Sequence, residues 1–129
     1  MRTTAARYID ATEETTAKLA KTFQCTPKFV YLALTYRSDT EKARKIRFTA
    51  VENYGATPMC HYPECETLHD TTEDHRQIMR QVFNNGATLR VDKRTGEAWI
   101  TNRKGETVVH KQVISFPQLS AIQVLAENL

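Results

Sequence analysis

The chain has 129 residues, of which 40% are hydrophobic, which is enough apolar content for a packed core and excludes a disordered chain. No run approaches the roughly 18 consecutive apolar residues of a membrane span, and the N-terminus lacks the apolar core of a signal peptide, so we expect a cytoplasmic protein without membrane contact. The net charge of +3 divides into +4 for residues 1–55, −5 for residues 56–75 and +4 for residues 76–129, and the basic parts suit a polyanionic partner.

Helices are predicted throughout residues 1–56. Their starts are marked by capping residues, which are Asp10 or Thr12 for the first helix, Thr26 for the second and residues 38–40 for the third. Thr26 is the strongest of these signals, because Pro27 follows it at the first helical position. The third helix is expected to end at Gly55.

Residues 57–73 are predicted to form an acidic linker, because they combine proline, cysteine, histidine and acidic residues without a sustained period. The chain has three cysteines, and an odd number favours reduced thiols over a disulfide framework. Two thiols and two imidazoles can hold zinc, and the candidate ligands are Cys60, Cys65, His69 and His75. Their spacing does not match the usual structural zinc sites. We therefore expect no cofactor, with zinc as the alternative.

Residues 74–129 are predicted to form an αβββα unit. Apolar spacing from Asp74 to Phe83 favours a helix, which stops at the Asn-Asn-Gly run of residues 84–86. The following segments alternate and are separated by glycine turns, which predicts strands at residues 88–92, 98–101 and 107–114 in a three-stranded antiparallel sheet. A last helix begins at residues 115–117.

The spacing of the first two predicted helices is informative for function. Two short helices joined by a three- or four-residue turn can place the second helix in the major groove of DNA. Val30 and Leu34 are expected to anchor the second helix to the core. Its outward residues are then Thr26, Pro27, Lys28, Tyr31 and Leu32.

Residues 19–34 and 38–50 resemble the helix-turn-helix DNA-binding domains of lactose-repressor-type transcription regulators, and the resemblance covers about residues 10–56. It implies that Thr26 touches a phosphate and that Pro27, Lys28 and Leu32 stand at base-reading positions. Further side chains are expected along one phosphate backbone, namely Tyr36, Arg37, Lys42, Arg44, Lys45 and Arg47.

The C-terminal half shows no catalytic set. His110 lies in a predicted strand without a neighbouring nucleophile, and Asp92 and Glu97 flank a turn, where carboxylates are usually solvated. Trp99 is expected to pack under the sheet. In outline the unit also resembles small domains with which some phage-type integrases touch DNA. If it acts in this way, the residues that contact phosphates would be Arg90, Lys93, Arg94, Arg103 and Lys104.

The sequence therefore predicts the α+β class, with an N-terminal three-helix helix-turn-helix module (1–56), an acidic linker (57–73) and an αβββα unit (74–129) for dimerisation or a second nucleic-acid contact. The expected function is double-stranded DNA binding without catalysis, as a small bacterial or phage-type transcriptional regulator. We expect a homodimer, because one such module contacts about half a site. The alternative is a protein-interaction adaptor of a phage or mobile element.

Overall fold

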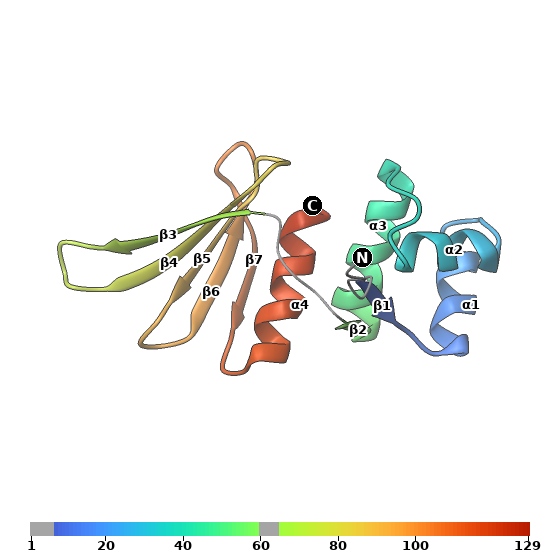
Figure 1. Ribbon diagram of the computed structural model, residues 1–129, viewed down its shortest axis with the longest axis horizontal. Helices are drawn as coiled ribbons and strands as arrows, with labels where there is room; N and C mark the ends of the chain where they lie inside the picture. Colours follow the sequence, from blue (N-terminus) through green and yellow to red (C-terminus); the bar gives the residue numbers. More distant parts are fainter. Residues whose placement is uncertain (1–6, 60–64) are drawn as a thin grey trace, which may run out of the picture. The chain divides into compact units, whose positions relative to one another are not determined.

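The structure is a computed structural model that describes residues 7–59 and 65–129 (Figure 1). The chain divides into two compact units, which are residues 1–62 with Asn128 and residues 63–127 with Leu129. We call them the N-terminal unit and the C-terminal unit and describe each by itself.

The N-terminal unit contains, within residues 7–59, the elements β1 (Tyr8–Asp10), α1 (Glu13–Thr22), α2 (Pro27–Leu34), α3 (Glu41–Tyr54) and β2 (Thr57–Met59). All three helices begin in the same way, because a threonine hydroxyl accepts a hydrogen bond of 3.1 Å from the backbone N–H three residues later. These N-caps are Thr12, Thr26 and Thr40. Gly55 ends α3 in the left-handed conformation, with φ of 63°. The predicted helix starts and the predicted end of α3 are therefore confirmed.

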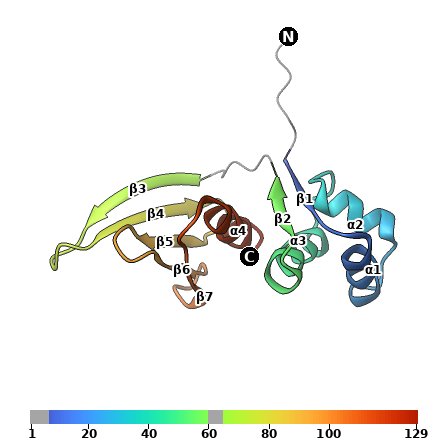
Figure 2. The same cartoon turned by 90° about the horizontal axis from the view of Figure 1, so that it is seen from below.

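Helix α2 lies across α1 and α3, which run side by side in the views of Figures 1 and 2. Its inner side is fully packed, since Val30, Ala33 and Leu34 are buried. Helix α2 packs against both neighbouring helices, whose buried side chains include Leu19 of α1 and Ile46 of α3. Burying this apolar side fixes which side of α2 faces outward.

The predicted fold class is wrong for the N-terminal half, because the three helices do not form a module of their own. Strands β1 and β2 pair antiparallel, with Ile9 opposite Pro58, and the Ile9 side chain is buried in the unit. Extended segments on both sides of the helices are thus part of the fold. Strand β2 also occupies the first residues of the predicted linker.

The C-terminal unit contains, within residues 65–129, an antiparallel sheet of five strands and one helix. The elements are β3 (Cys65–Thr71), β4 (Gln77–Phe83), β5 (Thr88–Asp92), β6 (Glu97–Thr101), β7 (Thr107–Gln112) and α4 (Phe116–Glu127). The strands lie in chain order, so that each pairs with the next along the sequence. Strands β5 to β7 and helix α4 are close to the predicted bounds.

The predicted three-stranded sheet is wrong because two further strands, β3 and β4, belong to it. The apolar residues of Gln77–Phe83 also fit a helical spacing, but this segment pairs along its length with β3 and β5. Residues 65–71 belong to the segment predicted as an acidic linker. They form an edge strand of which most side chains are exposed, so its sequence has no apolar alternation to reveal it.

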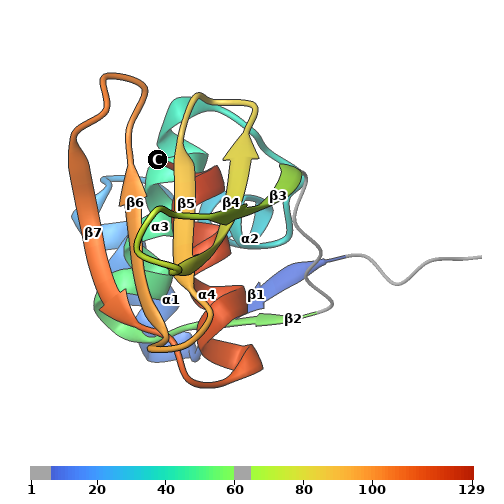
Figure 3. The same cartoon turned by 90° about the vertical axis from the view of Figure 1, so that its left-hand side faces the viewer.

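Helix α4 covers one face of this sheet. Gln81, Leu89, Ile100 and Val109 occupy facing register positions on β4 to β7, so their side chains share one face, and all four are buried. Gln123 of α4 donates from Nε2 to Oε1 of Gln81 at 2.9 Å, which places the helix on that face. Figure 3 shows the sheet from the opposite side, with α4 behind the strands.

Candidate nucleic-acid interface

The outward side of α2 carries most of the side chains that the sequence singled out. Thr26, Pro27 and Lys28 are exposed at its N-terminal end, the Tyr31 side chain is 53% exposed, and Leu32 is half-buried. The hydroxyl of Thr26 accepts from the N–H of Phe29 at 3.1 Å, which leaves its own hydrogen available to an outside acceptor. The first turn of α2 therefore presents a hydroxyl donor and a lysine.

Cations from the segment after α2 lie on aromatic rings of α2. The Arg37 guanidinium is 5.8 Å from the centroid of the Tyr31 ring, and the Lys42 ammonium is 5.9 Å from that of Phe29. Both cations are exposed. These two contacts, each a cation–π interaction, hold positive charge beside the exposed side of α2.

Arg47, predicted to contact DNA, is buried instead, and this prediction is wrong. Only 1% of the residue is exposed. Its guanidinium donates to the carbonyl oxygens of Ala33 at 3.0 Å and Ser38 at 2.8 Å, and to Oδ1 of Asp39 at 2.7 Å. Arg47 therefore links α3 to the C-terminal end of α2 and has no free side toward a ligand.

Two other predicted contacts are also engaged within the unit. Arg44 is ion-paired with Asp39, with Nε and Oδ1 3.7 Å apart, although 42% of its side chain is exposed. The ring of Tyr36 is half-buried, with the guanidinium carbons of Arg7 and Arg47 at 4.2 and 4.7 Å from its centroid. Lys45, by contrast, is exposed and its partner is Glu41 on the same helix, at 3.5 Å.

Sequence reasoning missed the role of Asp39. This residue lies next to the cap of α3, but Thr40 is the cap and the Asp39 carboxylate is ion-paired with both Arg44 and Arg47. The arginine partners follow five and eight residues later, and this spacing has no local signature. Only the packing of α3 against α2 brings these groups together.

The described members of the candidate zinc set are not gathered at one point. Cys60 lies outside the described residues. Cys65 and His69 are four residues apart on β3, which separates them by roughly 13 Å, and His75 is in the turn that follows. Burial raises the pKa of the Cys65 thiol, which disfavours the thiolate that zinc requires. In residues 7–59 and 65–129 no three histidine, cysteine or acidic side chains are grouped to hold a metal.

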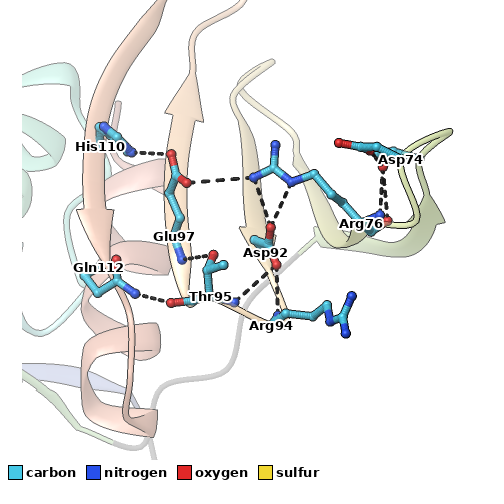
Figure 4. Close-up of polar contacts among 9 residues, drawn as sticks. Asp74, Arg76, Asp92, Arg94, Thr95, Glu97, His110 and Gln112 are labelled. Atoms are coloured by element: carbon cyan, nitrogen blue, oxygen red, sulfur yellow. Dashed lines mark hydrogen bonds and ion pairs between the residues drawn. The ribbon is translucent and has the colours of Figure 1, made fainter.

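A row of polar contacts crosses the face of the sheet that points away from α4 (Figure 4). Arg76 is 3.0 Å from Oδ2 of Asp92 and 3.8 Å from Glu97, and Glu97 is 2.9 Å from Nε2 of His110. Asp92 is buried, and its other oxygen accepts from the backbone N–H groups of Arg94 and Thr95. These hydrogen bonds, that from Arg94 above all, lower the pKa of Asp92 despite its burial. The sequence suggested a solvated carboxylate at this position. Asp92 is instead a fixed part of the turn.

The basic residues of the integrase-like alternative are not gathered in one place. Arg90 lies within β5, whereas Lys93 and Arg94 are in the β5–β6 turn. Arg103 and Lys104 are in the β6–β7 turn, at the opposite end of β6 because consecutive turns of a meander alternate between the two ends of its sheet. Strand β6 is about 17 Å long, so these groups form no single cluster of phosphate contacts.

Comparison of the chain with protein-family models, with curated proteins and with solved structures found no match. In the part of the chain that the structure describes, no helix is long and apolar enough to cross a membrane.

Proposed function

We propose that the chain binds double-stranded DNA through the outward side of α2. The observation that carries the proposal is the grouping of Lys28, Tyr31, Arg37 and Lys42 on one exposed surface, above a helix whose other side is buried. A single helix fits the major groove, which is about 12 Å wide. The short turn between α1 and α2 leaves the first turn of α2 free to enter it, as in helix-turn-helix proteins.

The chemistry of this surface suits phosphates at its rim and bases at its centre. Thr26 and the N-terminal end of α2 offer hydrogen-bond donors to a phosphate oxygen, where the helix dipole also favours negative charge. Lys28 and the phenol of Tyr31 are the polar groups that face a base edge. Arg37 and Lys42 add charge without sequence information.

The role that fits such a surface is that of a transcriptional regulator in the cytoplasm of a bacterium or phage-infected cell. Pro27 and Leu32 offer no paired hydrogen bonds to base edges, so one copy makes a limited contact. We infer that two copies bind together, on half-sites about 34 to 36 Å apart, which doubles the contacts. No chemical reaction is part of this role.

The proposal is tested by measuring the affinity of the full chain for a random duplex pool and for duplexes selected from it. Lys28→Glu is expected to weaken binding at least tenfold, because it reverses a charge next to the phosphates. Lys104→Glu makes the same change of charge in the β6–β7 turn and serves as the matched control, with less than a twofold effect expected.

Equal weakening by both variants would show that net charge alone drives binding, and the proposal would then be wrong. The proposal would also be wrong if the wild-type chain bound no duplex at about 50 mM salt but retained a protein partner. That second outcome would instead support an adaptor role.

A further inference from the structure

The face of the five-stranded sheet that points away from α4 carries a row of planar side chains. Arg80, Arg90, Trp99 and His110 occupy facing register positions on the adjacent strands β4, β5, β6 and β7. They therefore lie on one face, and it is not the face that α4 covers, because they alternate with the residues beneath α4. Arg80, Arg90 and Trp99 are half-buried and His110 is exposed.

Two guanidinium planes, an indole and an imidazole thus follow one another at the strand spacing of about 4.8 Å. These are the groups on which unpaired bases stack in proteins that bind single strands. Figure 3 looks onto this face, in front of which the β3–β4 hairpin extends.

The charges along the row are compensated at its ends and not at its centre. Arg80 donates from Nε to Asp70 at 2.9 Å, and His110 is 2.9 Å from Glu97. Arg90 donates only to the hydroxyl of Thr101, at 3.2 Å, and it has no ion pair with any residue in 7–59 or 65–129. Two arginines in directly opposed positions are unfavourable on a sheet, so an anion between them is stabilising.

The centre of the row therefore combines a positive charge without a carboxylate partner and the neighbouring indole of Trp99. Phosphate complements the first group and a nucleobase complements the second. A duplex does not suit the row, because its bases are stacked on each other, and a sheet of five strands is about 19 Å wide, too wide for the major groove.

We propose that this face binds single-stranded nucleic acid, with a base stacked on Trp99 and the adjoining phosphate bound by Arg90. The site is in the C-terminal unit and is independent of the proposed duplex contact of α2. The two proposals therefore fail separately.

The test uses the full chain with three labelled probes: a mixed-sequence DNA strand of about 20 nucleotides, the RNA of the same sequence, and the annealed DNA duplex. Trp99 is the single tryptophan of the chain, so its fluorescence reports the site directly. We expect a single strand to quench this emission and the duplex to leave it unchanged. Comparison of the DNA and RNA strands identifies the preferred sugar.

Variants of the chain are compared by fluorescence anisotropy of the labelled strand. Arg90→Gln and Trp99→Leu are each expected to weaken binding about tenfold, and Trp99→Phe, which retains a ring, is expected to have a smaller effect. Arg94→Gln removes the same charge from an exposed turn whose backbone, not its side chain, binds Asp92, and it is the matched control. Lys28→Glu is expected to leave single-strand binding unchanged.

An unchanged Trp99 emission in saturating single strand would overturn the proposal, and this readout needs no variant. Equal weakening by Arg90→Gln and Arg94→Gln would also overturn it. So would quenching by the duplex alone, which would place paired DNA on this face.

Discussion

A buried arginine is stable only when acceptors surround its guanidinium, and Arg47 satisfies this condition with two carbonyl oxygens, one carboxylate and the amide oxygen of Asn128. The carbonyl of Ala33 belongs to the last turn of α2, and besides Arg47 it accepts from the N–H of Tyr36 at 3.1 Å. Arg47 therefore satisfies the end of the helix that we propose to bind DNA. We therefore expect Arg47 to affect DNA binding only indirectly, by holding α2 in position.

Arg47→Met is expected to destabilise the N-terminal unit by about 2 to 4 kcal/mol, because the Ser38 carbonyl and the Asp39 carboxylate lose their hydrogen bonds to a charged donor. Urea unfolding followed by far-UV circular dichroism measures the change. Lys45→Met removes a cation from the exposed side of the same helix, and its ion pair with Glu41 contributes less than about 0.5 kcal/mol. Similar losses for the two variants would contradict the structural role of Arg47.

Asp92 makes the stability of the C-terminal unit dependent on pH. Its folded-state pKa lies below the ordinary value of 3.8, so its contribution is complete above about pH 5 and is lost as pH falls through the folded-state pKa. Asp92→Asn is expected to lower the urea midpoint at pH 7, and the difference from wild type should shrink as pH falls toward 3. Glu106→Gln, in the exposed β6–β7 turn, should show no such convergence.

Among the elements, the three N-capped helices allow structure and binding to be separated. Thr12, Thr26 and Thr40 make the same hydrogen bond, so each threonine-to-alanine change removes about 1 kcal/mol of stability. Thr26→Ala is expected to weaken duplex binding severalfold as well, because only this cap lies at the exposed end of α2. Thr12→Ala is the matched control for affinity. Equal affinities of the two variants would remove Thr26 from the interface.

The elements that sequence predicted well are those whose signals are local. A capping threonine, Pro27 at the first turn of α2 and Gly55 at the end of α3 act within a few residues, and the same is true of the glycine turns around β6. The apolar residues of β4 (Ile78, Met79, Val82 and Phe83) fit both the helical and the strand period, and only pairing with β3 and β5 decides for a strand.

Helix periodicity predicts which residues of α2 are exposed, and this part of the candidate site could be predicted from the sequence. Lys28 and Tyr31 were assigned outward because Val30 and Leu34 had to face inward, and the structure has this arrangement. Arg47 was misassigned because a charged residue on a helix is usually exposed, and its acceptors come from packing. The planar row of the sheet could not be predicted, because its members are brought together by a register that the sequence does not specify locally.

At the scale of the molecule, the basic charge of the N-terminal unit sets the salt dependence of duplex binding. Three exposed cations of the proposed surface are available to phosphates, namely Lys28, Arg37 and Lys42. The slope of log K against log salt is then expected to be about −2.7 for each copy, and Lys42→Gln should reduce its magnitude by about 0.9. A filter-binding series over a range of potassium chloride measures both. A slope near zero would exclude phosphate contacts by these residues.

The pairing of β1 with β2 has a consequence for engineering. Asp10 and Thr57 are register partners, so the chain enters and leaves the helical part through neighbouring strands, with Cα atoms about 5 Å apart. A segment with such closely spaced ends can be inserted into a surface hairpin of a host protein without distorting the segment or the hairpin. Both ends of residues 7–59 can therefore be joined to a carrier protein at the same place.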